Sequence, residues 1–544
     1  GMYTISYADG FFVFPAVPPG NYRITVEAQG MQSWEGQLLV QTGQAAQVEP
    51  VLNVGGTATE ITVAGDVSNP INVDNATLGA TLERQRIDQL PLNGRSITTL
   101  IGATTPGLEG TRAYGLAAAA LDVVQDGAVL QNRDPGGVFQ RPPGLDSVEE
   151  FRVETNGSSA KVNRPGTVIL TTRSGTNQFH GSMFETARNN GFGVARRRQD
   201  YYEKPPHLVR NEFGFWNGGP VYLPKVYNGR NKTFWFFNYE AYRTYAATTT
   251  STTVPTAAMR GGDFSGLVDG TGRAYTIYDP WTTESKTWQR QPFAGNRIPA
   301  SRMSPLAKYL YGITPMPTHT DINPMVRDNF IGPGPAIRRD HAETMKFDHN
   351  LSQRDRVFLR YTHGNKYDKR LGNDPSFPTL NDETNVTFSP ARNESAVVSW
   401  THTISPTFFS ETAGTYAYQR VNVQGGTPGN WAEQMDLPNP AGGALFPNII
   451  NTGFYQYKQP DNERNNRTWI VTLDQNFTHI RGRHQLQFGG RIRAERFFEL
   501  PDGARSGTVS FSGPQTGLYD PASGATYGAV PRTGHESANF CLGL

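Results

Sequence analysis

Segments in which apolar and polar residues alternate fill the part of this chain that follows Phe179. In residues 467–480 (RTWIVTLDQNFTHI) one face would carry Trp469, Val471, Leu473 and Phe477, and the other Thr468, Thr472, Asp474, Asn476 and Thr478. The same alternation recurs in residues 394–404, 408–420 and 484–497. Because successive side chains of a strand point to opposite faces, these segments predict strands with one apolar and one polar face.

The length of these segments bears on the fold class. Each runs for about ten residues, which a tilted strand needs to cross the hydrocarbon core of a membrane, whereas strands of soluble proteins average about five or six. Tight turns at 404–407 and 481–483 contrast with long stretches rich in Gly, Pro, Asn and Asp, such as 425–465. This combination favours an outer-membrane β-barrel. A large soluble all-β protein, such as a propeller or stacked sandwiches, stays open as the alternative.

Composition narrows the choice of partner. The 50 lysines and arginines nearly balance the 48 aspartates and glutamates, which leaves a formal net charge of +2, so we do not expect nucleic acid as a partner.

The single cysteine, Cys541, excludes an intrachain disulfide. No run approaches the roughly 18 apolar residues that indicate a transmembrane helix, but the strands of a barrel alternate and never form such a run.

No catalytic or metal-binding pattern stands out. The chain has no His-Glu-x-x-His sequence, no P-loop and no Gly-x-Ser-x-Gly elbow. Ser174 and His180 lie six residues apart without an acidic partner, and Glu149-Glu150 fits the solvated start of a strand. We therefore expect no enzyme, no catalytic residue, no metal site and no cofactor. The run Arg196–Arg198 predicts a solvated loop, with contact to an anionic ligand as the alternative.

Glycine and proline divide the N-terminal third into parts. Residues 1–54 predict a small β module, with strands at Phe11–Phe14 and Tyr22–Ala28 on either side of a proline turn. Residues 55–70 predict a polar linker around one short β-prone segment. Residues 71–175 mix patterns, with a helix that Pro91 stops, followed later by strands.

Several motifs follow one another in a fixed order, and this order bears on the choice between a membrane barrel and a soluble β protein, which periodicity leaves open. They are LPLNGRSITTLIGATTPGL (90–108), DGA (126–128), LDSVEEFRVET (145–155), TTRSGTNQFHGSMFETARN (171–189), RNEFGFWNGGPV (210–221), NGRNKTFWFFNYEAYR (228–243) and KFDHNLSQRDRVFLRYT (346–362). This series resembles the Oar-like TonB-dependent transporters of the Gram-negative outer membrane. Residues 1–54 resemble the C-terminal part of a carboxypeptidase regulatory-like domain, a transthyretin-like β-sandwich with a carbohydrate-binding-like fold.

The resemblance implies a mainly β fold in four parts. Residues 1–54 would be the partial β-sandwich, residues 55–70 a linker and residues 71–175 an α+β plug domain. Residues 176–544 would be the N-terminal portion of an antiparallel barrel in the cell outer membrane, of the type that has 22 strands. Because a stretch of this length with long loops is too short for all of those strands, the resemblance implies an incomplete barrel and a chain that is a fragment.

The resemblance also gives a role to one polar stretch. Ser174, Gly175, Thr176 and Asn177 would form the hinge between the last plug strand and the first barrel strand. Gly175 and Asn177 would suit such a turn because both residue types tolerate positive φ.

Transporters of this family are energised from the periplasm, so the resemblance implies TonB as a partner. Glu60, Ile61, Thr62 and Val63 are the candidate TonB box, which would add as an edge strand to the C-terminal domain of TonB in the TonB–ExbB–ExbD system. Alternatively, this segment is the last strand of the N-terminal module. The other implied partners are outer-membrane lipid and a solute whose identity and contact residues stay unknown. The competing function is an adhesive or carbohydrate-binding surface protein that the barrel anchors, for which a plug and a TonB box would serve no purpose.

Overall fold

The structure of the chain is a computed structural model. It describes residues 3–6, 10–14, 17, 20–40, 46, 48–54, 61–66, 78–90, 92, 94–95, 97, 100, 108–109, 112–113, 121–130, 139, 141–156, 166–192, 207–371, 386–425, 429–451, 456–457, 464–481, 484–500, 505–511, 515–520 and 530–544.

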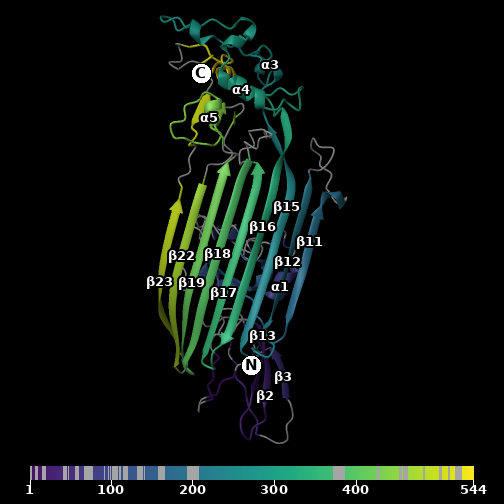
Figure 1. Ribbon diagram of the computed structural model, residues 1–544, viewed down its shortest axis with the longest axis vertical. Helices are drawn as coiled ribbons and strands as arrows, with labels where there is room; N and C mark the ends of the chain where they lie inside the picture. Colours follow the sequence, from purple (N-terminus) through teal and green to yellow (C-terminus); the bar gives the residue numbers. More distant parts are fainter. Residues whose placement is uncertain are drawn as a thin grey trace.

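One large antiparallel sheet dominates the structure and is called the wall below (Figure 1). Its strands follow one another in chain order, and each pairs with the next. They are β11 (His180–Asn189), β12 (Leu208–Pro220), β15 (Thr233–Thr252), β16 (Phe330–Asn350), β17 (Asp355–Leu371), β18 (Val386–Ser405), β19 (Phe408–Gly425), β22 (Arg464–Arg481) and β23 (His484–Glu499). Within the described residues the wall is an open sheet with β11 and β23 at its two edges.

The burial of the wall residues is inverted relative to a soluble protein. On β22 the polar residues Thr468 and Thr472 are only 2% and 3% exposed, whereas the apolar residues Val471 and Leu473 between and beyond them are 50% and 53% exposed. On the edge strand β23 the contrast is weaker: Ile492 is 71% exposed, and the side chains of its neighbours Arg491 and Arg493 are 23% and 22% exposed. A sheet with its apolar face outward and its polar face inward matches the strands of a membrane barrel. Between the two fold classes that the sequence leaves open, this burial decides for the barrel.

The two ends of the wall differ as the sequence predicts. Short turns join β16 to β17 and β18 to β19, and only two residues separate β22 from β23. A small hairpin of β13 (Tyr222–Leu223) and β14 (Tyr227–Asn228) lies at the same end. Long connections follow β15 and β19 at the other end. Several strands are longer than predicted, up to the 21 residues of β16, because they continue past the alternating apolar stretch toward the long connections.

A second sheet lies against the polar face of the wall and is called the inner domain. Its strand order is β4 (Leu78–Glu83), β9 (Val148–Asn156), β10 (Gly166–Thr172), β7 (Leu121–Gln125) and β8 (Ala128–Val129). It also contains α1 (Arg84–Gln89), which ends before Pro91 as predicted, η1 (Leu145–Ser147) and a ribbon of β5 (Leu108–Glu109) and β6 (Arg112–Ala113). Its core is built from Ile87, Phe151, Val153, Val168 and Leu170, and the wall adds Ala417 and Ile470 to that core.

The N-terminal module and one strand from the predicted linker (residues 55–70) form a single small sheet among the described residues. β1 (Gly20–Val26) pairs antiparallel with β2 (Trp34–Val40), and β2 pairs parallel with β3 (Ile61–Asp66). The predicted strand at Phe11–Phe14 is wrong, because these residues lie outside any strand. β2 and β3 lie beneath the short-turn end of the wall (Figure 1).

The long connections fold into a compact structure of their own at the opposite end of the wall, called the cap (Figure 1). The connection after β15 supplies α3 (Ala257–Arg260), η3 (Pro280–Thr282), η4 (Ala294–Asn296), η5 (Ala300–Arg302) and α4 (Pro305–Ile313). The connection after β19 supplies α5 (Trp431–Gln434), β20 (Asn448–Asn451) and β21 (Gln456–Tyr457), and the segment after β23 supplies β24 (Thr508–Phe511) and α6 (Glu536–Leu542).

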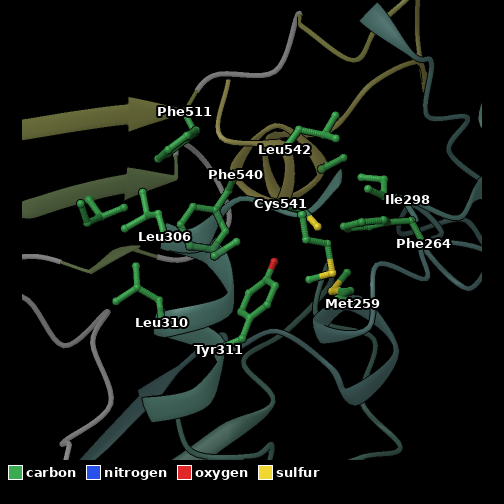
Figure 2. Close-up of a cluster of buried hydrophobic side chains, with 14 of the residues drawn as sticks. Met259, Phe264, Ile298, Leu306, Leu310, Tyr311, Phe511, Phe540, Cys541 and Leu542 are labelled. Carbon is green, nitrogen blue, oxygen red and sulfur yellow. The ribbon is translucent and has the colours of Figure 1, made fainter. Parts of the chain in front are cut away.

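The three segments of the cap share one apolar core (Figure 2). Phe540 of α6 is fully buried and contacts the rings of Tyr311 and Phe511, with centroids 5.4 and 5.2 Å apart. β20 and β24 pair in parallel across two of the segments. The expectation of a polar loop at 425–465 is therefore wrong in part, since Phe446 and Ile449 are buried in this core.

One further element is short: η2 (Asn190–Phe192) follows β11. In the described part of the chain, no helix has the length and apolar character to cross a membrane.

Candidate functional site: the contact between the inner domain and the wall

The DGA motif builds the tip of the inner domain that meets the wall. Asp126 and Gly127 connect β7 to β8 and have φ values of +47° and +95°. A two-residue hairpin turn with positive φ at both positions strongly favours an Asp-Gly pair. The turn thus fixes the Asp126 carboxylate at the tip, where the backbone amide and the hydroxyl of Thr172 donate to it at 3.0 and 2.5 Å.

Two cations of the wall face this carboxylate. Arg360 of β17 is fully buried, and its Nε lies 3.2 Å from Oδ2 of Asp126. The same guanidinium donates to the carbonyl oxygen of Gln125 at 2.6 Å and also to Ser395 of β18. Lys346 of β16 donates to the carbonyl oxygen of Thr172 at 3.1 Å. Burial alone would raise the pKa of Asp126, but Lys346, Arg360 and the two hydrogen bonds from Thr172 hold it below its usual range.

A second polar cluster joins η1 to β15. Glu240 of β15 accepts a hydrogen bond of 2.6 Å from the backbone amide of Asp146. Asp146 in turn lies 2.9 Å from the guanidinium of Arg84 and 2.7 Å from that of Arg95. Arg95 also stacks over the ring of Phe184 on β11, 4.0 Å from its centroid. Buried charges are stable only when paired and hydrogen-bonded, so this cluster fixes the inner domain against the wall.

A third contact lies further along the wall. The Nε of Arg141 lies 3.5 Å from a carboxylate oxygen of Asp340 on β16. The backbone carbonyl oxygen of Arg141 accepts a hydrogen bond of 3.1 Å from the side chain of Asn393 on β18. Together the three contacts consist mainly of hydrogen bonds and ion pairs, while among the described residues the apolar core of the inner domain takes only Ala417 and Ile470 from the wall.

The predicted hinge residues lie in the connection between the two sheets. β10 of the inner domain ends at Thr172 and β11 of the wall begins at His180, so Ser174–Asn177 fall between them. Asn177 exchanges two hydrogen bonds, of 2.6 and 2.7 Å, with Asn231, which lies two residues before the start of β15. The side chain of Thr176 donates to the carbonyl oxygen of Gln178 at 3.1 Å.

The physical reason given for glycine in the hinge is wrong. Neither Gly175 nor Asn177 has a positive φ. Instead, a Cβ atom on Gly175 would lie 2.2 Å from the carbonyl oxygen of Trp235 and 2.8 Å from that of Gly219. Glycine is therefore required because the connection between the two sheets passes directly over the backbones of β12 and β15.

The other candidate residues are placed only in part. Ile61, Thr62 and Val63 of the candidate TonB box lie in β3, where they pair with Trp34, Glu35 and Gly36 of β2. Glu60 and the Arg196–Arg198 run lie outside the described residues.

The roles of Arg360, Lys346 and Glu240 were not predicted from the sequence, although Arg360 and Lys346 lie in the motif at 346–362 and Glu240 lies in the motif at 228–243. One signal was present: Arg360 stands between Leu359 and Tyr361, so it takes the polar face of a strand whose other face is exposed and apolar. When a charged side chain of a membrane strand faces the interior of the barrel, a partner of opposite charge is expected inside the barrel.

Comparison with known proteins agrees with this architecture. Residues 171–544 match the family model described as outer membrane beta barrel domain, and residues 1–53 match the carboxypeptidase regulatory-like domain. The chain belongs to the outer membrane beta barrel domain family, and its place is the outer membrane. It is a homologue of the TonB-dependent transporter Oar of Myxococcus xanthus, with 25% identity over 256 residues, which cover 43% of this chain and 23% of that protein.

Solved structures with a similar course of the chain are transporters and receptors. The outer membrane transporter YddB from Escherichia coli is 9% identical with a TM-score of 0.43, and covers 77% of this chain and 48% of its own. The ferric enterobactin receptor of Pseudomonas aeruginosa is 11% identical with a TM-score of 0.40, and covers 77% of this chain and 49% of its own. The chain thus spans less than a quarter of the Oar relative and about half of each of these structures.

Proposed function

We propose that the chain belongs to an outer-membrane importer in which the inner domain is the plug and TonB supplies the energy. The plug would comprise residues 71–175, the hinge Ser174–Asn177, and the barrel would begin at residue 176. The observation that carries this proposal is the polar character of the contact between Asp126 and Arg360 and of its two companions. Hydrogen bonds and ion pairs can be exchanged for water, so such a contact holds a domain in place yet permits it to move.

The polar contact also argues against a simple anchor. A surface adhesin that uses the barrel only as an anchor needs no domain against the polar face of the wall, and it needs no charged pair such as Asp126 and Arg360. The importer accounts for both features. The solute is unassigned, and we propose that it enters from the side of the cap, because long loops of outer-membrane barrels face the outside.

The partner is the C-terminal domain of TonB, and residues 60–63 are the segment that it would bind. Strand addition uses the backbone hydrogen bonds of an extended peptide. Ile61, Thr62 and Val63 already adopt an extended strand, paired in parallel with the edge of β2. This pairing fits the alternative that the segment is the last strand of the N-terminal module. Because β3 is an edge strand among the described residues, TonB would add to the side of β3 that faces away from β2.

A proline substitution tests the segment. Thr62→Pro removes one backbone donor, so we expect it to abolish capture of the full chain by immobilised TonB C-terminal domain. Val51→Pro is the matched control, since Val51 is 76% exposed and lies outside the strands of the module. Equal capture of the Thr62→Pro and control variants would show that the segment is a module strand and not a TonB box.

A further inference from the structure

Three arginines stand side by side on the outer face of the wall. The register pairs Arg392 of β18 with Arg420 of β19, and Arg420 with Arg467 of β22. Directly paired residues of adjacent strands have Cβ atoms about 5 Å apart. They lie on the face that also carries Val398 of β18 and Val471 of β22, which are 51% and 50% exposed, so the arginines point away from the inner domain.

The row lies at one edge of the apolar belt. Along β22 toward the cap, the outward residues are Leu473, Val471, Trp469 and then Arg467. The ring of Trp469 is tilted against that of Tyr418 on β19, with centroids 5.3 Å apart. Aromatic side chains mark the interface between the hydrocarbon core and the headgroups. The arginine row therefore lies at headgroup level, on the side of the long connections, which is the outer leaflet.

The charges of the row are only partly balanced. Arg392 forms an ion pair with Glu394, and the guanidinium of Arg467 lies 5.6 Å from the ring centroid of Phe498. Within the described residues, neither Arg420 nor Arg467 forms an ion pair. Like charges directly opposite each other on neighbouring strands are destabilising. An anion that bridges the row would remove this repulsion, and guanidinium groups bind phosphate through two parallel hydrogen bonds.

We propose that Arg392, Arg420 and Arg467 bind the phosphate groups of a phosphorylated glycolipid in the outer leaflet. The lipid would lay its acyl chains on the exposed apolar residues of β18, β19 and β22 and its sugar phosphates on the arginine row. This binding does not depend on the transport of a solute. It would place one specific lipid against the wall, directly beneath the cap.

Binding of purified lipid A to the detergent-solubilised full chain tests the proposal, with bound lipid measured by native mass spectrometry. Arg420→Gln should weaken binding of the bis-phosphorylated form about fivefold, because one cation near a charged membrane surface contributes about 1 kcal/mol. Arg420→Lys keeps the charge and should retain most of the affinity. Arg481→Gln is the matched control, since Arg481 is exposed at the opposite end of β22, and it should bind lipid as the wild-type chain does.

Three results would overturn the proposal. One is equal affinity of Arg420→Gln and wild type. Another is equal binding of lipid A from which the phosphates have been removed, which would show that only the acyl chains are recognised. The third is displacement of the lipid by inorganic phosphate at matching concentration, which would indicate a site for free anions. Because Arg420→Gln relieves repulsion within the row, we expect it to fold at least as well as wild type, so a loss of binding is not explained by misfolding.

Discussion

Asp126 and Arg360 lie 234 positions apart in the sequence, yet their side chains meet at 3.2 Å in the buried contact between the inner domain and the wall. Asp126 is held by a tight hairpin turn, and Arg360 is held by a strand of the wall. The pair therefore joins two rigid elements of separate sheets, which makes it a sensitive point for testing how firmly the inner domain is bound.

Replacing Asp126 by asparagine should loosen the inner domain. The substitution leaves the charges of Arg360 and Lys346 facing a neutral group, and breaking a buried pair from one side costs about 3 to 5 kcal/mol. Hydrogen exchange of β7, β8 and β10 should accelerate while that of β22 and β23 stays unchanged. The double variant Asp126→Asn, Arg360→Met should recover part of the protection. Unchanged exchange in the single variant would contradict a structural role for the pair.

Alanine at Gly175 should displace the connection between β10 and β11. Its Cβ would lie 2.2 Å from a backbone oxygen of the wall, so the connection must shift, at a cost of roughly 2 kcal/mol. We expect proteolysis within residues 173–179 to become at least tenfold faster. Gly414→Ala on β19 is the control, because a Cβ there meets nothing within 4 Å. If both variants resist protease like wild type, close approach is not the reason for glycine at this position.

The rate at which Cys541 is alkylated measures the stability of the cap, because Cys541 is buried in the cap and is the only cysteine in the sequence. Burial raises the pKa of its thiol to about 12, so alkylation at neutral pH should be slow while the cap is folded. Phe540→Ala should open the shared core, at a cost of roughly 3 to 5 kcal/mol, and accelerate labelling by more than tenfold. Met316→Ala, at a residue 56% exposed, should leave the rate unchanged. Fast labelling of the wild-type chain would show that the three segments do not form a stable core.

The cap should lose stability in mild acid. Burial lowers the pKa of His535 to about 4, from an ordinary value of 6.5. Between these two values the unfolded segment takes up a proton that the folded cap refuses, so stability is full above pH 6.5, falls as the pH drops toward 4 and then levels off. The loss from this residue should total about 3 kcal/mol.

The variant His535→Asn isolates this effect. His535 caps α6 by accepting a hydrogen bond of 3.1 Å from the backbone amide of Ser537, and asparagine can cap a helix without titrating. Hydrogen exchange of α4 and α6, measured from pH 7 to pH 4, should show a weaker acid dependence in the variant. The same dependence in both proteins would assign the acid sensitivity to other groups.

The sequence predicted the wall well because its signal is local. Alternation along a single strand, as at Trp469, Val471 and Leu473, needs no knowledge of neighbouring strands, and the short turns are equally local. It left open which face meets water, since a soluble sheet shows the same alternation. The exposure of Val471 and the burial of Thr472 settled that point, and burial depends on the whole fold.

The cap and the polar contact between the inner domain and the wall could not be predicted from the sequence, because the residues that form them are distant in the chain. Tyr311, Phe511 and Phe540 come from two separate segments, each of which is rich in turn residues and resembles a solvated loop by itself. A local signal did exist in Ser304-Pro305, since serine caps α4 by accepting from Ala307 at 3.1 Å and proline occupies its first turn. Pairs such as Asp126 and Arg360 leave no such trace in a single sequence.

Disulfide cross-linking to TonB would show whether residues 60–63 engage the C-terminal domain of TonB. Thr62→Cys in the full chain would be combined in cells with single cysteines along the edge strand of the TonB C-terminal domain, and buried Cys541 should not compete. We expect a cross-link at Thr62→Cys that disappears when Ile61→Pro is added, because proline at the neighbouring position prevents strand addition. No cross-link, or one that persists with Ile61→Pro, would contradict a TonB-energised importer that is engaged through this segment.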